Sequence, residues 1–294
     1  MGKALADAYP EARATFDEAD AALGEPLSSL IFEGPEDRLT LTENTQPAIL
    51  TMSVAASRVL EARGIRPSFV AGHSLGEYSA NVAAGTMTFA DAVRTVRRRG
   101  RYMQAATPVG SGAMAAILGL DADRVRQACE EAAQGEVVSP ANINGAGQVV
   151  IAGSAAAVQR ACERAKALGA KRAIPLSVSA PFHCALMKPA EERLAPELRA
   201  LQVSDPRVPI VANVDAMPKR DAASAIEALV RQVSSPVLWE DVVRRLASED
   251  VTTYVEVGPG TVLSGLVKKI HKEATIYNLA APDDLAAIES ALRV

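Results

Sequence analysis

The 294-residue sequence has no long apolar run and no large excess of charge of one sign. A membrane-spanning helix needs about 20 consecutive apolar residues, and no stretch approaches that length. The net charge is −4, and basic residues do not alternate with aromatic ones, so we expect neither membrane nor nucleic-acid binding. Because the first residues lack the apolar core of a signal peptide, we expect a cytoplasmic protein.

Cysteine is also scarce. The three cysteines, Cys129, Cys162 and Cys184, are odd in number and widely separated, which predicts neither a disulfide framework nor a zinc site. Cys184 follows His183 directly, but sequence neighbours usually point apart, so a Cys-His pair is not favoured. We expect no metal and no bound cofactor.

The remaining composition is that of an ordinary globular protein, with 49% hydrophobic and 22% charged residues. A chain of this length can bury a full core. We therefore expect one large domain, or a large domain with a small one inserted into it.

The most informative stretch is residues 69–80, which read Phe-Val-Ala-Gly-His-Ser-Leu-Gly-Glu-Tyr-Ser-Ala. A short apolar run precedes Gly-X-Ser-X-Gly, and helix-compatible residues follow, as in the nucleophile elbow of serine acyl enzymes. We expect Gly72 and Gly76 to permit close backbone packing around Ser74. The N–H of Leu75 would open the helix and stabilise an oxyanion. Since Gly-X-Ser-X-Gly alone is common by chance, the flanking strand and helix carry the prediction.

The order of predicted elements indicates two units. Alternating strands and helices in residues 1–110 and 179–294 predict a parallel sheet covered on both faces. Residues 111–178 have the order βαββαβ, which is typical of a ferredoxin-like domain. We interpret this segment as a subdomain inserted into the larger core.

A serine nucleophile needs a base, and the sequence has three histidines. His73 adjoins Ser74 on a tight turn, where it is badly placed to reach the hydroxyl, so we expect it to line the pocket. His271 ends a polar helix and is expected at the surface. His183, in the loop Ser-Ala-Pro-Phe-His, is the remaining candidate for general base and acid.

Helical periodicity separates Arg99 from its neighbours. At 100° per residue, Arg99 falls beside Ala92 and Met103 on the apolar face of its predicted helix. A buried guanidinium must find an anion. Either a structural ion pair or a substrate carboxylate, held by two parallel hydrogen bonds, could supply it. The other arginines of the helix are predicted to face water (Arg94, Arg97, Arg98 and Arg101).

Several motifs are shared with a known family. They are Thr45-Gln-Pro-Ala, Gly72-His-Ser-Leu-Gly-Glu-Tyr, Arg99-Gly, Asn144 with Gly147-Gln-Val-Val-Ile-Ala-Gly, Ser179-Ala-Pro-Phe-His, Pro236-Val-Leu-Trp and Glu256-Val-Gly-Pro-Gly. Over nearly its whole length the sequence resembles the malonyl-CoA:acyl carrier protein transacylase family of fatty acid synthesis, which is related to the acyltransferase domains of polyketide synthases.

The resemblance implies an α/β-hydrolase-like core with a ferredoxin-like subdomain. It implies transfer of malonyl from coenzyme A to the phosphopantetheine thiol of acyl carrier protein through a serine ester, without metal or other cofactor. Ser74 would be the nucleophile, His183 the base and Arg99 the partner of the malonyl carboxylate. A backbone carbonyl, expected at Leu238, would orient the imidazole, and Phe182 would leave little room for an α-methyl branch.

The resemblance also implies partners. Acyl carrier protein is acidic in this family, so exposed basic residues are candidates for docking it (Arg97, Arg98, Arg101, Lys268 and Lys269). We expect a monomer that binds malonyl-CoA and this carrier.

One departure from the family concerns the start. Family members begin with a strand and a Gly-Gln-Gly-Ser-Gln loop, and Met1-Gly2 resembles only the end of that region. A start codon assigned too far downstream would explain this. If instead the protein truly starts at Met1, the resemblance implies a sheet that lacks one strand and an oxyanion site that lacks one wall.

Three alternatives remain. An acyl hydrolase or thioesterase uses the same elbow, but normally has Asp or Glu between serine and histidine in chain order. A polyketide-pathway acyltransferase would share the chemistry. A carrier-binding protein without activity would follow if the shortened N-terminal region disabled the site.

Overall fold

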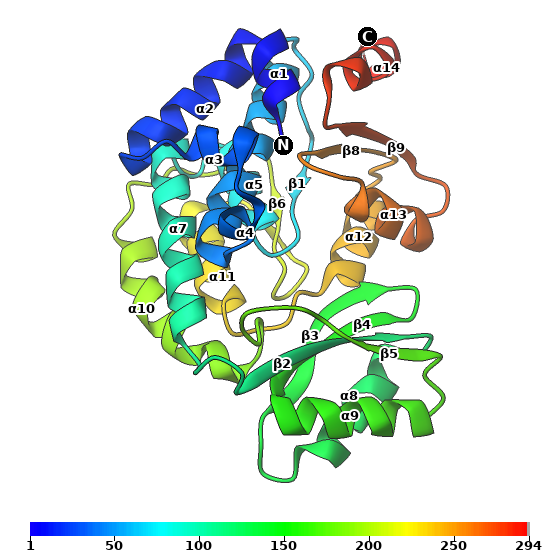
Figure 1. Ribbon diagram of the computed structural model, residues 1–294. Helices are drawn as coiled ribbons and strands as arrows, with labels where there is room; N and C mark the ends of the chain where they lie inside the picture. The colour runs from blue at the N-terminus through cyan, green and yellow to red at the C-terminus, as the bar shows by residue number, and fades with distance from the viewer. Residues whose placement is uncertain (293–294) are drawn as a thin grey trace.

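The computed structural model describes residues 1–292, and it is a mixed α/β protein. Helices from the first half of the chain stack on one side of the larger part, and the C-terminal strands and helices lie on the other (Figure 1). A four-stranded sheet with two helices forms a small lobe below them, which we define as residues 112–175.

The helical side of the larger part is held together by its apolar faces. The helices are α1 (Lys3–Ala8), α2 (Pro10–Leu23), α3 (Leu27–Glu33), α4 (Glu36–Leu39), α5 (Thr42–Glu61), α7 (Phe89–Ala105), α10 (Lys188–Arg199) and α11 (Ala222–Gln232). Leu5, Phe16 and Leu50 are fully buried in the cluster they form. Helix α2 starts with proline and stops at Gly24, whose left-handed φ of 67° favours glycine.

The strands of the larger part form two sheets instead of the one continuous parallel sheet that we expected. In the first sheet, β1 (Val70–Ala71) pairs in parallel with β6 (Ile210–Val211), which pairs antiparallel with β7 (Pro218–Lys219). In the second, β8 (Thr253–Val257) pairs in parallel with β9 (Thr275–Leu279). Among the described residues no strand joins β1 to β8, so the larger part does not contain the single parallel sheet that the sequence predicts.

The remaining elements of the larger part surround these strands. They are α6 (Gly76–Ala83), α12 (Trp239–Ser248), α13 (Val262–Ile270), α14 (Leu285–Leu292) and the 3₁₀ turns η1 (Ala185–Met187) and η2 (Pro282–Asp284). Helix α6 continues directly from the turn after β1, so the predicted strand–turn–helix unit is present.

The small lobe follows the βαββαβ order expected from the sequence. Its elements are β2 (Gly112–Leu118), α8 (Ala122–Ala133), β3 (Val138–Gly145), β4 (Gln148–Ser154), α9 (Ala155–Ala167) and β5 (Arg172–Pro175). The strands form one antiparallel sheet in the order β3-β4-β2-β5. Both helices pack on the face that points away from the larger part (Figure 1).

Alternation along the strands gives this sheet two apolar faces. Ile117 and Ile151 pack with α8 and α9 on the outer face. Met114 and Val150 point to the inner face, where they pack against Cys184 and the segment around it. The inner face therefore supports the loop that returns the chain to the larger part.

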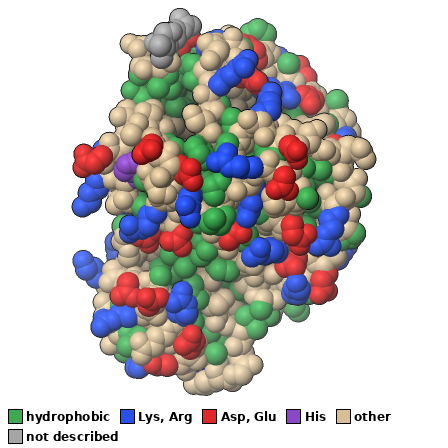
Figure 2. All heavy atoms as spheres, turned by 180° about the vertical axis from the view of Figure 1, so that it is seen from behind, with side chains coloured by type: hydrophobic (Ala, Val, Ile, Leu, Met, Phe, Trp, Pro, Cys, Tyr) green, Lys and Arg blue, Asp and Glu red, His purple; other side chains and the backbone are tan. Residues whose placement is uncertain are grey.

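The surface has no area of a single charge sign on the face seen in Figure 2, where basic and acidic side chains intermingle. No helix within residues 1–292 is both long and apolar enough to cross a membrane.

The core of the small lobe gives a stability prediction. Ile151→Ala should lower the free energy of unfolding by about 2–5 kcal/mol, because Ile151 is fully buried and a cavity would remain. Ile174→Ala is the matched control: Ile174 is 40% exposed in the same sheet, and its truncation should cost under about 1 kcal/mol. Urea denaturation measures both, and equal losses would contradict this placement of the core.

Candidate active site

The turn between β1 and α6 holds Ser74 in a strained conformation. Its φ is 52°, in the left-handed region that non-glycine residues seldom adopt. A Cβ on Gly72 would lie 2.1 Å from the backbone of Gly76, so only glycine fits at position 72. A Cβ on Gly76 would meet no described atom within 4 Å, so the prediction that both glycines are needed for packing is wrong for Gly76.

The serine hydroxyl contacts the histidine expected from the sequence. Ser74 Oγ lies 2.6 Å from His183 Nε2, although the two residues are 109 positions apart. His183 is 3% exposed and also has a left-handed φ, of 59°. Ser74 itself is half-buried, so its hydroxyl lies at the edge of the solvent-accessible surface.

The other imidazole nitrogen contacts a backbone carbonyl. His183 Nδ1 lies 3.0 Å from the carbonyl oxygen of Gln232, the last residue of α11. Carbonyls in the last turn of a helix have no intrahelical partner, so this oxygen is free to accept. The prediction that Leu238 supplies this carbonyl is wrong, because the Leu238 oxygen accepts the N–H of Val242 at the start of α12.

Burial keeps the imidazole neutral. Desolvation, with the nearby charge of Arg99 as a second cause, lowers the pKa of His183 to about 3. Since Nδ1 faces a carbonyl oxygen, it carries the proton, and Nε2 is left as the acceptor for the Ser74 hydroxyl. The arrangement is that of a serine paired with a neutral base.

Arg99 is brought to the same point by α7. It is 2% exposed, and its guanidinium donates to Ser74 Oγ (3.2 Å), Gln46 Oε1 (2.7 Å) and Gln232 Oε1 (2.9 Å). Its charge also lies over the ring of Tyr78, 5.4 Å from the centroid. Burial lowers the pKa of Arg99.

No acidic side chain in residues 1–292 forms an ion pair with Arg99. The guanidinium donates to two neutral amide oxygens and to the Ser74 hydroxyl, and its Nε has no hydrogen-bond partner in the described part of the chain. A structural ion pair therefore does not explain why this charge is buried. The site retains a cation that can bind an anionic group.

One backbone donor is available beside the hydroxyl. The N–H of Leu75 has no acceptor among the described residues and lies at the start of α6. N–H groups at a helix start attract negative charge. Phe182, next to His183, is half-buried and packs against the inner face of the small-lobe sheet.

Three polar residues that the sequence analysis did not assign complete the site. Gln46 lies within the shared Thr-Gln-Pro-Ala motif, so a signal for it existed. Asn213 and Gln232 lie in segments without a motif. Asn213 Oδ1 accepts the N–H of Ser74 at 2.7 Å, and its Nδ2 donates to the Gly72 carbonyl at 2.8 Å.

The other two histidines do not contact Ser74. His73 Nε2 lies 2.9 Å from Asn144 Oδ1, and its ring lies 5.6 Å from that of Trp239. Burial lowers the pKa of His73. His271 Nδ1 lies 3.1 Å from the hydroxyl of Tyr254.

The predicted exposure of one arginine is wrong. Arg97 is 7% exposed, since α5 lies against this side of α7, and it contacts Asn44 and Glu25. Arg98 and Arg101 are largely exposed and pair with acidic side chains, Glu197 and Glu43 respectively.

Within the described residues, no group of three or more histidine, cysteine, aspartate or glutamate side chains could hold a metal ion. Cys184 is buried, and its thiol contacts the Pro181 carbonyl rather than His183.

Comparisons of the sequence with known proteins identify close relatives. A family model described as the acyl transferase domain matches residues 1–286. The malonyl CoA-acyl carrier protein transacylase of Escherichia coli is 52% identical over 284 residues, which are 96% of this chain and 92% of the relative. The Bacillus subtilis protein of that name is 50% identical over 286 residues, which are 97% and 90% of the two chains.

Solved structures of proteins with similar names have the same fold as this chain. An acyl carrier protein S-malonyltransferase from Vibrio cholerae aligns with a TM-score of 0.96 at 46% identity, covering 98% of this chain and 94% of that one. A malonyl-transacylase in complex with its type II PKS acyl-carrier protein aligns with a TM-score of 0.95 at 47% identity, covering 99% and 94%.

The elbow gives a paired prediction. Gly72→Ala should destabilise the protein by about 2–4 kcal/mol or displace Ser74, because the added methyl overlaps the Gly76 backbone. Gly76→Ala should fold with a melting temperature within a few degrees of the parent, because its methyl meets open space and alanine favours the helix. Thermal denaturation of both variants tests this, and the opposite order of stability would contradict the turn geometry.

Proposed function

Because the chain belongs to the acyl transferase domain family, we propose that its Ser74, His183 and Arg99 carry out malonyl transfer from coenzyme A to acyl carrier protein. The enzyme is a malonyl-CoA:acyl carrier protein S-malonyltransferase of fatty acid synthesis. The observation that supports these roles best is the convergence of His183 and Arg99 on one serine hydroxyl.

In the first step, His183 Nε2 takes the proton of the Ser74 hydroxyl, and the oxygen attacks the thioester carbonyl of malonyl-CoA. The Leu75 N–H is placed to donate to the oxyanion that forms. The C–S bond then breaks, and the coenzyme A thiolate receives the proton from His183. Malonyl remains on Ser74 as an ester.

In the second step, the phosphopantetheine thiol of the carrier gives its proton to His183 and attacks the ester carbonyl. The ester bond breaks, and His183 returns the proton to Ser74 Oγ. The neutral state of the buried imidazole suits both steps, because it can accept a proton without first losing one.

Arg99 and Phe182 account for the choice of acyl group. The malonyl carboxylate would accept hydrogen bonds from the Arg99 guanidinium, which has no anionic partner in residues 1–292. The side chain of Phe182 would restrict the space for an α-methyl branch. Coenzyme A thioester and carrier protein are substrates, so no further cofactor is required.

We also propose an α/β-hydrolase-like core made of residues 1–110 and 179–294 and a ferredoxin-like subdomain made of residues 111–178. The core of the small lobe, around Ile117 and Ile151, shares no residue with the helical core around Leu5 and Phe16, and this supports the division. The strand order β3-β4-β2-β5 with both helices on one face supports the ferredoxin-like assignment.

Monomeric state and cytoplasmic location stay predictions from the sequence. Carrier docking through basic residues also stays a prediction, now without Arg97, which is buried. Arg98, Arg101, Lys268 and Lys269 remain candidates, and binding through them would weaken as salt rises.

The hydrolase alternative is disfavoured by the partner of His183. Hydrolases with this elbow orient the histidine with Asp or Glu, whereas His183 Nδ1 faces a backbone carbonyl. A polyketide-pathway role would use the same chemistry on another carrier, and the similar malonyl-transacylase bound to a polyketide carrier is the observation that keeps it open.

Ser74→Ala should abolish malonyl loading of acyl carrier protein, with a loss of about 10⁴-fold or more, because no other hydroxyl within residues 1–292 contacts the His183 side chain. Mass spectrometry of the carrier measures the product, and release of free malonate instead of loaded carrier by the parent enzyme would favour the hydrolase. Carrier loading by Ser74→Ala at the parent rate would contradict the assignment.

Arg99→Ala should lower kcat/KM for malonyl-CoA by about 10–100-fold, the value of a charge-assisted hydrogen-bonded contact. Acetyl-CoA, which lacks the carboxylate, should be affected far less. The control is Arg94→Ala, which removes a charge at the surface of the same helix, paired with Asp91, and should leave kcat/KM for both substrates unchanged. Equal losses for malonyl-CoA and acetyl-CoA would show that Arg99 has only a structural role.

A further inference from the structure

Helix α6 carries a buried carboxyl group that the mechanism above does not use. Glu77 is 1% exposed and lies one turn after Ser74. Buried acidic side chains are rare unless they have specific partners. We propose that Glu77 is a positioning residue that holds Asn213 and Gln232, and through them the reactive arrangement of Ser74, His183 and Arg99.

One oxygen of Glu77 joins two separate segments of the chain. Its Oε2 accepts the backbone N–H of Asn213 at 3.0 Å and the side-chain amide of Gln232 at 2.8 Å. Asn213 follows β6, and Gln232 ends α11. The carboxylate thus fixes both segments relative to the elbow helix.

The Asn213 branch leads to the nucleophile. The side chain of Asn213 bonds to the Ser74 N–H and to the Gly72 carbonyl, so it spans the strained turn on both sides of His73. Because the backbone N–H of Asn213 is held by Glu77, the position of this brace depends on the carboxylate.

The Gln232 branch leads to the base and to the cation. The Gln232 amide nitrogen also donates to the Ser74 carbonyl at 2.9 Å, and its amide oxygen accepts from Arg99. Its backbone carbonyl accepts from His183 Nδ1. With the Gln232 N–H groups directed at Glu77 and at the Ser74 carbonyl, the amide oxygen can only face Arg99.

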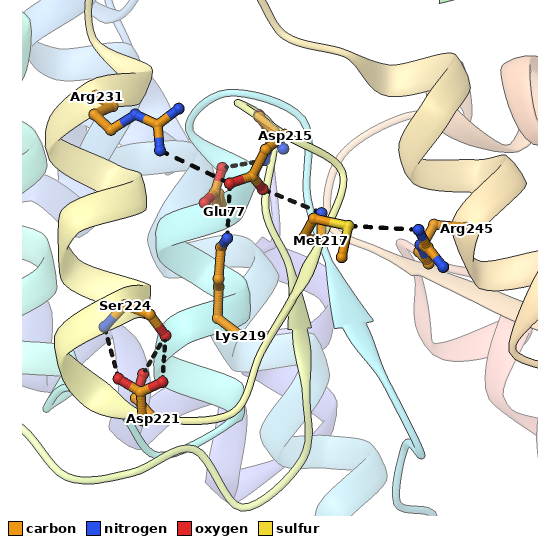
Figure 3. A network of polar contacts seen from close by, with 9 residues as sticks. Glu77, Asp215, Met217, Lys219, Asp221, Ser224, Arg231 and Arg245 are labelled. Carbon is orange, nitrogen blue, oxygen red and sulfur yellow. Dashed lines mark hydrogen bonds and ion pairs between the residues drawn. The ribbon is translucent and has the colours of Figure 1, made fainter.

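The pKa of Glu77 lies near neutral pH. The pKa of Glu77 is raised to about 7, chiefly by burial and also by the nearby carboxylate of Asp215, although Gln232, Asn213 and Arg99 oppose the rise. Asp215 lies in the loop after β6 and contacts the Met217 N–H (3.1 Å), Lys219 of β7 (2.8 Å) and Arg231 of α11 (3.8 Å), as Figure 3 shows. The titratable groups that interact with Glu77 are Arg99 from α7, Asp215 from the loop after β6 and Tyr78 from α6, and burial raises the pKa of Tyr78 to about 12, so that it is neutral at pH 7.

The ionisation of Glu77 determines the direction of the expected pH effect on the rate of Ser74 malonylation. Above pH 7 the ionised carboxylate accepts strong hydrogen bonds from both amides. As pH falls through about 7, protonation weakens these bonds and removes a negative charge that interacts with Arg99. His183 cannot produce this transition, because its own pKa is lowered to about 3. His73 titrates below its usual range as well.

The test rests on the proposed roles of Ser74, His183 and Arg99 and uses the full chain. The rate of Ser74 malonylation is measured from the burst of coenzyme A release, without carrier, between pH 5.5 and 8.5. In the parent protein the rate should rise about tenfold from pH 6 to pH 8 with a midpoint near 7. Glu77→Gln keeps the shape and an acceptor oxygen, so it should fold, react more slowly at pH 8, and lose this transition.

A second variant covers the case in which Glu77→Gln does not fold. Asp215 is not one of the described residues that contact Ser74. The substitution Asp215→Asn removes a negative charge that raises the pKa of Glu77. It should move the midpoint of the parent profile to lower pH while the rate at pH 8 stays unchanged.

The outcomes distinguish a failure of the proposed roles of Ser74, His183 and Arg99 from a failure of the proposed role of Glu77. No burst in the parent protein would contradict the proposed residue roles. A burst whose pH profile is the same in the parent, Glu77→Gln and Asp215→Asn proteins would overturn the role of Glu77 and leave those residue roles intact. An unchanged midpoint in Asp215→Asn alone would also overturn it.

Discussion

The site depends on a single amide residue, Gln232. Its backbone carbonyl orients His183, its side-chain oxygen holds Arg99, and its amide N–H groups bond to Ser74 and Glu77. The proposed base, nucleophile and substrate-binding cation, His183, Ser74 and Arg99, come from segments far apart in the chain, and Gln232 contacts all three. This residue takes the structural place that Asp or Glu has in many serine enzymes, without adding a charge beside the imidazole.

The fold supports this convergence from two sides. Helix α11 ends where its last carbonyl has no intrahelical partner, so it can serve His183. The inner face of the small-lobe sheet packs against the loop that carries His183. Both Ser74 and His183 have left-handed backbones, and such strain persists only where the surrounding structure fixes it.

The sequence predicts features that depend on neighbouring residues better than features that depend on contacts between distant segments. The elbow is a local motif, and the place of Arg99 follows from helical periodicity, so both could be found. Every residue has a backbone carbonyl, so the sequence contains no signal for the one that contacts His183. The prediction of Leu238 is therefore wrong, and the carbonyl is that of Gln232. The exposure of Arg97 was misjudged, because periodicity does not show that α5 covers that side of α7. The division of the strands into two sheets depends on long-range pairing, which periodicity does not contain.

The most direct test of the central claim is a crystal structure of the protein reacted with malonyl-CoA in the absence of carrier. The account predicts malonyl in an ester bond to Ser74 Oγ, with its carboxylate within hydrogen-bonding distance of the Arg99 guanidinium and His183 still bonded to the Gln232 carbonyl. An adduct whose carboxylate points into solvent away from Arg99, or malonyl attached to another residue, would contradict it.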